Sequence, residues 1–394
     1  MFADFIDEEL QALTEKSLFR RLRSVADEQG PLLTVDGQSV LNFSSNNYLG
    51  LANHPRLRLA AKEAIDRYGC GSGASRLISG NMTLHEELEH KIALLKGTEA
   101  ALVFNSGFQA NTGIIPALVA AEDVVFSDSL NHASIIDGCR LARGKTVVYP
   151  HCDMNALEQS LNEHSGVRRK LIVTESVFSM DGDEAPLREI VELAEKHGAG
   201  IMADEAHATG VFEPRGAGLV AKLGLGDRVL VQMGTLGKAL GGFGAFVAGS
   251  KKLREFLVNR CRSFIFTTAL PPAVMAMGIA AIDIVFKEPE RRERLRENSG
   301  LLRAGLEHLG MNVGTGGSHI LPVIIGDAGA CMTFSERLLS DGLFAQGIRP
   351  PTVPAGTSRL RMTVMATHTP EQIQTALKVF TEVKSEHDVF VRSA

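Results

Sequence analysis

Three side chains that could carry out chemistry follow apolar runs at separate places in this sequence. They are the imidazole of His132, the carboxylate of Asp204 and the primary amine of Lys238. An amine can bond to a carbonyl carbon, a carboxylate can hold a cation, and an imidazole can move a proton or donate a hydrogen bond. Because ligands of α/β sheets bind outside the carboxyl ends of the strands, the sequence predicts that these groups meet in one active site.

Lys238 lies in a glycine-rich stretch, residues 234–242. It is either a solvated lysine in a turn or an amine that forms a Schiff base with an aldehyde cofactor. A nucleotide-binding P-loop would need glycine six residues before the lysine and serine or threonine after it, but this chain has Gln232 and Ala239 there. In the Schiff-base interpretation, the glycines let the backbone approach a cofactor ring and the Thr235 hydroxyl meets a phosphate.

Asp204 precedes Lys238 by 34 residues, which is enough for one crossover and one strand. It either caps the next turn or pairs with the ring nitrogen of pyridoxal 5′-phosphate (PLP). That nitrogen stays protonated, and the ring stays an electron sink, only beside a buried anion. Residues 204–207 also match the helicase DEAH box, but without a P-loop we attribute that match to chance.

His132 and the pair Gly107–Phe108 each precede a predicted helix. The histidine is either structural or stacked on a planar cofactor. The free backbone N–H groups at a helix start form an anion site suited to phosphate, although an ordinary N-terminal turn explains Gly107 and Phe108 equally well.

Short apolar runs alternate with helical patterns through the middle of the chain. The predicted strands are Ala100–Phe104, Asp123–Ser127, Thr146–Tyr149, Lys170–Thr174, Gly200–Asp204, Val229–Met233 and Ala245–Ala248. The helical patterns between them include Gln109–Val119, Met154–Glu163 and Leu187–His197. This alternation predicts an α/β fold with a mostly parallel central sheet and helices on both faces.

The pattern of apolar and polar residues along the sequence predicts that the chain has three parts. Residues 1–50 form an N-terminal helix and hairpin segment, residues 51–285 a large α/β domain, and residues 286–394 a smaller α+β domain. The first helix is expected over residues 2–25, and a hairpin follows with its turn at Asp36–Gly37.

The C-terminal part is predicted to begin with a long charged helix over residues 288–309. Its clearest strands are Ile320–Ile325 and Arg359–Val364.

The bulk composition excludes several classes of protein. The 394 residues carry a net charge of −5, which does not favour binding to nucleic acid or to an anionic membrane. The five cysteines are irregularly spaced, so we expect neither structural disulfides nor a zinc cluster. An acidic N-terminus without a signal peptide, and no apolar run of about 18 residues, predict a cytoplasmic protein without membrane spans.

Motifs spread over nearly the whole chain carry a specific resemblance. They are Asn42–Gly50, Gly71–Gly80, Asn131–Ser134, Val177–Gly182, Asp204–His207, Thr235–Lys238 and Arg359–Arg361. Together they resemble the α-oxoamine synthases, a family of PLP-dependent transferases of fold type I. The resemblance implies PLP as the cofactor and a homodimer with active sites at its interface.

The resemblance also implies roles for individual residues. Lys238 matches the Schiff-base lysine, His132 the ring-stacking histidine and Asp204 the partner of the pyridinium nitrogen. Matches to the other cofactor contacts are Ser179 and His207 near the ring hydroxyl, Gly107, Phe108 and Thr235 at the phosphate, and Thr267 and Thr268 at a phosphate across the dimer. The implied substrate contacts are Arg361 at the amino-acid carboxylate, Asn47, His132, Thr352, and an N-terminal arginine at the acyl group. Residues 20–23 contain three arginines, so the match does not decide which of them is meant, and we favour Arg20.

Within the family, residues 263–272 and 349–354 favour a member that condenses L-alanine with a pimeloyl thioester of coenzyme A or acyl carrier protein, with loss of CO2. The nearest alternative is 2-amino-3-ketobutyrate ligase, which uses glycine and acetyl-CoA. Alternatives from other classes are a DEAH-type nucleotide hydrolase, opposed by the missing P-loop, and a non-catalytic scaffold subunit. The joint presence of Lys238, His132 and Asp204 opposes the scaffold.

Overall fold

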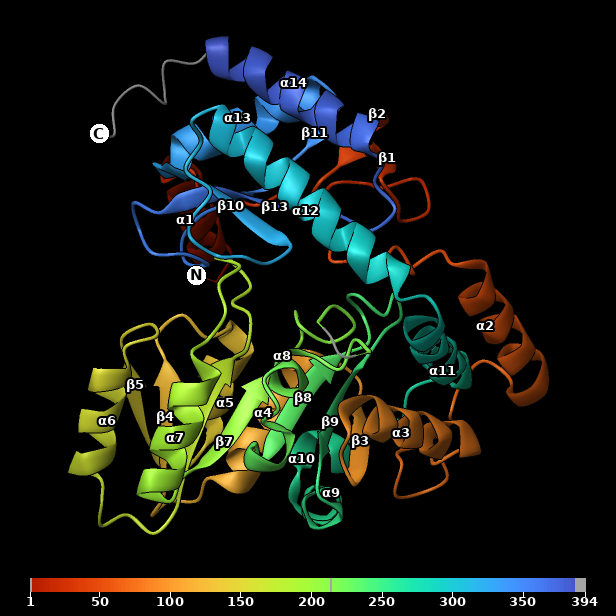
Figure 1. The fold of residues 1–394 in the computed structure, drawn as a ribbon, viewed down its shortest axis with the longest axis vertical. Helices are drawn as coiled ribbons and strands as arrows, with labels where there is room; N and C mark the ends of the chain where they lie inside the picture. The colour runs from red at the N-terminus through yellow and green to blue at the C-terminus, as the bar shows by residue number, and fades with distance from the viewer. Residues whose placement is uncertain (1, 213–214, 387–394) are drawn as a thin grey trace. The chain divides into compact units, whose positions relative to one another are not determined.

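The computed structural model describes residues 2–212 and 215–386 (Figure 1). The chain divides into two compact units. The large unit comprises Leu49–Ser179 and Asp183–Arg292, and the small unit comprises Met1–Tyr48, Met180–Gly182 and Glu293–Ala394. The predicted boundaries at residues 50 and 285 stay predictions about folding domains.

The large unit contains a seven-stranded sheet in the order β3-β9-β8-β7-β6-β4-β5. Its strands are β3 (Ala100–Phe104), β4 (Val124–Asp128), β5 (Lys145–Tyr149), β6 (Lys170–Glu175), β7 (Gly200–Asp204), β8 (Val231–Thr235) and β9 (Ala245–Gly249). Strand β9 runs antiparallel to its neighbours β3 and β8, and the pairs from β8 through to β5 are parallel. The predicted mostly parallel sheet is therefore confirmed, and each predicted strand lies within two residues of an observed one.

Helices cover both faces of this sheet (Figure 1). On one face, α4 (Gly107–Leu118), α5 (Ala133–Leu141), α9 (Lys251–Arg260) and α10 (Arg262–Ile265) share a single apolar core with the strands. The paired helices α6 (Met154–Glu163) and α7 (Leu187–His197) lie on the other face. The remaining helices of the large unit are α2 (Pro55–Tyr68), α3 (Thr83–Lys96), α8 (Leu219–Lys222), the 3₁₀ turn Gly226–Arg228 and α11 (Pro272–Lys287).

The small unit is built from two three-stranded sheets and its own helices. One sheet has the order β1-β2-β11 and the other β10-β13-β12. The strands are β1 (Leu32–Val35), β2 (Gln38–Asn42), β10 (Ile320–Gly326), β11 (Leu343–Phe344), β12 (Gly347–Ile348) and β13 (Ser358–Thr363). The helices are α1 (Phe2–Glu15), α13 (Ala328–Ser340) and α14 (Pro370–Glu386), together with most of α12 (Glu290–His308).

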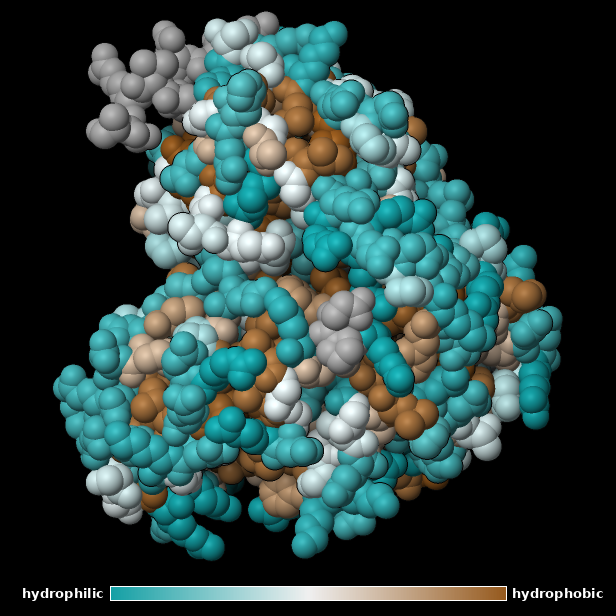
Figure 2. Space-filling view, viewed as in Figure 1, coloured by the Kyte–Doolittle hydropathy of each residue, from teal (hydrophilic) through white to brown (hydrophobic). Residues whose placement is uncertain are grey.

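The long helix α12 has one buried side and one charged side. Leu295, Leu302 and Leu306 are fully buried. Hydrophilic side chains cover its outward side on the face shown in Figure 2. The predicted charged helix is thus confirmed as amphipathic. None of the described helices has the length and apolar character needed to cross a membrane.

The first helix is shorter than predicted. The sequence predicts a helix over residues 2–25, but α1 ends at Glu15. Ser17 has a positive φ of 56°, and the N–H groups of Leu18 and Phe19 both turn back to the carbonyl of Leu13. The basic residues that follow instead reach partners far along the chain, so tertiary contacts override local helix propensity. The predicted hairpin is confirmed, with positive φ at Asp36 and Gly37.

Candidate active site

The carboxyl ends of β7 and β8, which are neighbours in the sheet, carry two of the predicted groups. Asp204 is the last residue of β7, and Lys238 lies three residues beyond Thr235, the last residue of β8. The Lys238 Nζ atom lies 2.8 Å from Nε2 of His207, which follows β7. Parallel pairing of the two strands therefore brings Asp204, His207, Thr235 and Lys238 to one edge of the sheet.

The Asp204 carboxylate is buried, with only 5% of the residue exposed. Its Oδ1 atom accepts a hydrogen bond from the backbone N–H of Ala206 at 2.9 Å, and Oδ2 accepts one from Asn111 Nδ2 at 2.9 Å. A buried anion held by neutral donors keeps its attraction for a nearby cation, because no water screens it. Oδ1 therefore caps the following turn, and the ring-nitrogen role stays a prediction.

His132 is the N-cap residue of α5, so its backbone and ring are fixed by the start of that helix. Its Nδ1 atom accepts the backbone N–H of Ser134 at 3.2 Å. Burial lowers the pKa of His132, the charge of Lys238 lowers it further, and Asp204 works in the opposite direction. The ring is therefore favoured in its neutral form and sits within electrostatic reach of both other groups.

The start of α4 lies directly against β8. Ser106 caps the helix by accepting the N–H of Gln109, which leaves the first N–H groups, at Gly107 and Phe108, pointing out of the helix end. A Cβ atom on Gly107 would come within 3.0 Å of the Thr235 Cγ2 atom. Glycine thus allows a 12-residue helix to present its N-terminus beside the Thr235 hydroxyl, which is a suitable cradle for a phosphate.

Thr267 and Thr268 lie close to the end of β3. Asn105, which follows β3, donates from Nδ2 to Thr267 Oγ1 at 3.3 Å and to the Thr268 carbonyl at 2.9 Å. An isolated β-bridge also joins Thr268 to Ser75. The structure therefore holds this pair of threonines in place within one chain.

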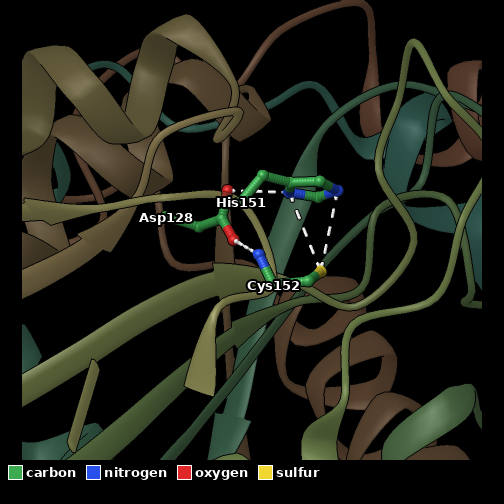
Figure 3. Close-up of side chains that lie close together, drawn as sticks. All are labelled: Asp128, His151 and Cys152. Carbon is green, nitrogen blue, oxygen red and sulfur yellow. Dashed lines mark hydrogen bonds and ion pairs between the residues drawn. The ribbon is translucent and has the colours of Figure 1, made fainter. Parts of the chain in front are cut away.

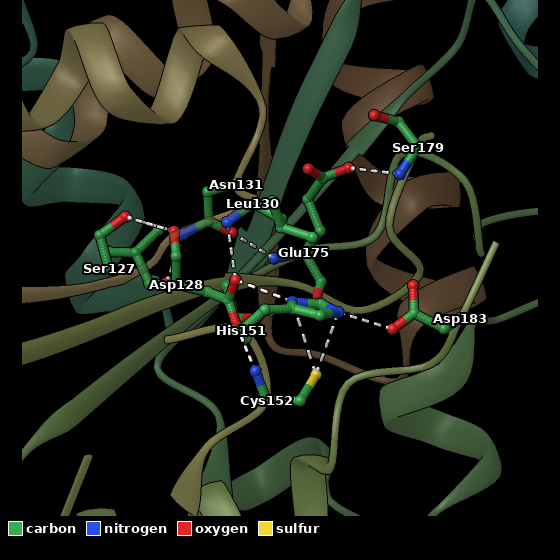
Figure 4. A network of polar contacts seen from close by, with 11 residues as sticks. Ser127, Asp128, Leu130, Asn131, His151, Cys152, Glu175, Ser179 and Asp183 are labelled. Carbon is green, nitrogen blue, oxygen red and sulfur yellow. Dashed lines mark hydrogen bonds and ion pairs between the residues drawn. The ribbon is translucent and has the colours of Figure 1, made fainter. Parts of the chain in front are cut away.

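Ser179 is hydrogen-bonded to a carboxyl group that the sequence analysis missed. Its backbone N–H donates to Oε2 of Glu175, the last residue of β6, at 3.2 Å (Figure 4). Burial and the neighbouring Asp204 raise the pKa of Glu175 to about 8, against an opposing effect of Lys238. Glu175 is buried in the strand next to Asp204, where both effects favour its protonated form.

A second cluster missed by the sequence analysis is centred on His151, which follows β5. Its Nδ1 lies 2.9 Å from Asp128 Oδ1 and its Nε2 lies 2.8 Å from Asp183 Oδ2 (Figure 3 and Figure 4). Burial disfavours the charged ring, but the hydrogen bonds to both carboxylates outweigh it and raise the pKa of His151 to about 12. The histidine is therefore an imidazolium held between two carboxylates.

Asp128, His151 and Cys152 also place potential metal-ligand atoms within 4.8 Å of one another. Both ring nitrogens of His151 already point at carboxylate oxygens, however, and a metal ion needs an unprotonated nitrogen. The imidazolium thus occupies the position between the two carboxylates. Asp128 also accepts the backbone N–H groups of Leu130 and Cys152, so the cluster ties the loop that leads to His132 to two other loops.

Apart from His132, the predicted substrate residues belong to the small unit. Arg361, on β13, donates to Asn46 Oδ1 at 3.1 Å and to the Tyr48 hydroxyl at 3.3 Å, which places it beside the segment that contains Asn47. Arg359 forms an ion pair with Asp181 instead. Both arginines are buried on a strand with a neighbour on each side, so neither is a solvated residue of an edge strand.

Arg20 and Thr352 line one cavity of about 860 Å³ in the small unit. Arg21, Arg23 and Arg349 contribute further positive charge to its walls. Arg23 pairs with Asp36 at 3.0 Å and with Glu336, whereas Arg20 donates to the Pro350 carbonyl at 3.3 Å. Because two carboxylates already neutralise Arg23, it is the least suitable of the run to bind an anionic substrate.

Comparison with known proteins agrees with the predicted fold family. The family model described as aminotransferase class I and II matches residues 38–380. The 8-amino-7-oxononanoate synthase of Geobacter sulfurreducens is 54% identical over 381 residues, covering 96% of this chain and 97% of the relative. The Symbiobacterium thermophilum enzyme of the same name is 50% identical and covers 97% and 98% of the two chains.

Solved structures are similar over almost the same length. The serine palmitoyltransferase of Sphingomonas wittichii has a TM-score of 0.92 and 33% identity, covering 98% of this chain and 97% of its own. The 8-amino-7-oxononanoate synthase of Francisella tularensis has a TM-score of 0.74 and 28% identity, covering 88% and 98%. On the match over residues 38–380 and these full-length relatives, the chain belongs to the aminotransferase class I and II family.

Proposed function

We propose that this chain catalyses the PLP-dependent condensation of L-alanine with a pimeloyl thioester of coenzyme A or acyl carrier protein. The products are 8-amino-7-oxononanoate, CO2 and the free thiol, a step of biotin biosynthesis. The observation that carries the proposal is the group at the ends of β7 and β8: a buried carboxylate, an amine and a phosphate cradle. Relatives at 50–54% identity bear the name of this activity.

These residues fit PLP at each of its reactive parts. The Lys238 amine suits the aldehyde, and the buried Asp204 carboxylate suits a protonated ring nitrogen. The N-terminus of α4 and the Thr235 hydroxyl suit the phosphate, while His207 and Ser179 are assigned to the ring hydroxyl. When bound, PLP supplies an electron-withdrawing ring that stabilises negative charge on the amino-acid carbon.

The protein's own groups then move the protons and bind the charges. Lys238 would hold the cofactor through its amine, and the same amine would take the α-proton of alanine. His132 donates a hydrogen bond to the oxygen on which negative charge develops. Arg361 binds the alanine carboxylate through its fork of N–H groups. Arg20 binds the far carboxylate of the pimeloyl chain, and the other arginines around the 860 Å³ cavity support this choice.

We further propose that the working form is a homodimer. Ile78 is 79% exposed and Phe266 is 72% exposed, and the backbone segments that carry them are joined through the Ser75–Thr268 bridge. Phe108 and Phe243 are also large, exposed and apolar. Apolar side chains gathered beside a cofactor cradle favour burial against a second copy.

Turnover with defined substrate pairs tests the proposal. L-alanine with pimeloyl-CoA should give a kcat/KM well above glycine with acetyl-CoA and above L-serine with palmitoyl-CoA. Borohydride treatment followed by peptide mapping should place the reduced cofactor on Lys238. A preference for glycine and acetyl-CoA would overturn the substrate assignment and leave the cofactor assignment standing, whereas an adduct on another lysine would overturn the site.

A further inference from the structure

A chain of buried hydrogen bonds joins Asp204 to His132 through two residues that have no role in the proposed function. Asn111, on α4, lies with its Nδ2 atom 2.9 Å from Asp204 Oδ2 and 2.9 Å from Ser134 Oγ. Ser134, on α5, lies with Oγ 2.8 Å from His132 Nδ1. Asn111 is 0% exposed and Ser134 is 1% exposed, so water does not compete for these bonds.

The direction of each bond follows from which atoms carry hydrogen. The backbone N–H of Ser134 can only donate, and it points at His132 Nδ1 at 3.2 Å. Nδ1 therefore carries a lone pair and no hydrogen. The Ser134 hydroxyl, which approaches the same nitrogen, must donate its own hydrogen to it.

The same reasoning fixes the remaining links. With its hydrogen directed at His132, the Ser134 oxygen accepts from Asn111 Nδ2, whose second hydrogen goes to Asp204. Rotating the Asn111 amide by half a turn would set its oxygen against the Asp204 carboxylate and leave Ser134 without a donor. Only this arrangement supplies a donor to Asp204 Oδ2, to Ser134 Oγ and to His132 Nδ1.

We infer that Asn111 and Ser134 are positioning residues that hold His132 in the neutral tautomer with its proton on Nε2 and link it to Asp204. A neutral ring with two donors at Nδ1 has its only hydrogen on Nε2. That atom is the donor which the proposed function requires at the developing oxyanion, so this inference rests on the proposed function. The link also ties the group beside the ring nitrogen to the group that stacks on the ring.

The relay, which is the hydrogen-bonded chain Asp204–Asn111–Ser134–His132, keeps His132 neutral among several charged groups. Lys238 opposes protonation of the ring and Asp204 favours it, while the side chain of Glu175 accepts the backbone N–H of His132. A hydroxyl that donates to Nδ1 stabilises only the neutral ring. Removing it must therefore raise the pKa of His132, whichever charges remain.

The test is the protonation and tautomer of His132 in the cofactor-loaded protein without substrate. Long-range ¹H–¹⁵N correlation spectra of histidine-labelled protein report both, and a His132→Gln variant identifies the signal. Ser134→Ala should raise the pKa of His132 by about half a unit to one unit and increase the population protonated on Nδ1. Asn111→Ala should shift the signal in the same direction, because the Ser134 hydroxyl is then free to turn away.

Ser335→Ala is the matched control. It removes another buried serine hydroxyl, one that donates to the Ala345 carbonyl in the small unit, and should leave the His132 signals unchanged. In turnover assays Ser134→Ala should lower kcat about tenfold with a KM for alanine within about twofold of wild type. If Ser134→Ala and Asn111→Ala both keep the wild-type tautomer and pKa of His132, the inference is wrong. That outcome is separate from failure of the proposed function, which appears in wild-type substrate preference.

Discussion

Arg359 and Arg361 lie on the same strand, β13, but their guanidinium groups have different neighbours. Arg359 is held by Asp181, and Arg361 donates to Asn46 and Tyr48. Arg361→Lys replaces a planar fork by a point charge that cannot form two parallel bonds to a carboxylate. The loss of about 1.5–3 kcal/mol should raise the KM for alanine roughly tenfold to over a hundredfold and leave the KM for the acyl thioester nearly unchanged.

Steady-state kinetics with both substrates varied measure this effect, and Arg359→Lys is the control. That variant weakens the pair with Asp181, so it should lower the unfolding free energy without a selective change in the KM for alanine. If both substitutions raise the KM for alanine equally, Arg361 does not bind the alanine carboxylate.

His151 makes stability depend on pH in a predictable direction. Its pKa is raised to about 12 by Asp128 and Asp183, above the ordinary value of 6.5. The folded state thus holds a proton that the unfolded state releases, so the stabilisation is full below pH 6.5 and is lost as pH rises towards 12. Between pH 7 and pH 9 the wild type should lose up to about 1.4 kcal/mol per pH unit more than His151→Gln.

Urea unfolding at a series of pH values gives the two slopes. His90→Gln, at an exposed histidine on α3, should keep the wild-type slope. If His151→Gln and wild type lose stability in parallel, the histidine does not carry the extra proton in the folded state.

At the scale of elements, the sequence predicts most of the fold because local patterns and tertiary burial agree. The runs that became β6 and β7 are short and apolar, which is typical of buried parallel strands. The end of α1 was not predictable, because Arg20 and Arg23 find their partners more than 300 residues away. Local propensity carries no information about such contacts.

The residues of the candidate site could also be predicted only in part from the sequence. Lys238, Asp204 and His132 follow strand ends and form recognisable motifs, so their types and positions suggest chemistry. Asn111 is an ordinary-looking helix residue whose importance comes from Asp204, 93 residues further along the chain. Only the packing of α4 against the end of β7 reveals the pair. The Asp128–His151–Asp183 cluster was missed for the same reason.

The contact between α4 and α5 depends on one glycine. A Cβ atom on Gly138 would lie 2.7 Å from the Asn111 carbonyl oxygen and 2.9 Å from Ile115 Cδ1. Gly138→Ala should therefore push the helices apart and lower the unfolding free energy by about 1–3 kcal/mol. It should also raise the pKa of His132, since Asn111 and Ser134 lie on the two helices that separate.

Gly300→Ala provides the opposite result in a comparable helix. Gly300 is exposed on α12, and a Cβ atom there meets nothing within 4 Å. Because alanine restricts the unfolded chain, this change should stabilise the protein by up to about 1 kcal/mol. Urea unfolding of both variants measures the contrast, and a Gly138→Ala protein as stable as wild type would show that the helix contact is not tight.

At the scale of the whole molecule, the proposed dimer determines which chain supplies each contact to the cofactor. Thr267 and Thr268 are fixed beside Asn105 in their own chain, and the family resemblance implies that they contact the phosphate in the partner's site. In that arrangement, each active site takes Lys238 from one protomer and the two threonines from its partner. A dimer with twofold symmetry therefore contains two composite sites.

Mixed dimers distinguish this arrangement from a site made by one chain. One protomer carries Lys238→Ala and the other carries Thr267→Val with Thr268→Val, and both are inactive as homodimers. If the threonines act across the interface, each mixed dimer regains one intact site, so random co-assembly should restore about a quarter of wild-type turnover. If they act within their own chain, both sites stay defective and no turnover returns. Co-expression with two affinity tags isolates the mixed species, for which the expected value rises to about half. Turnover at the background of the parent homodimers would assign the threonines to the site of their own protomer.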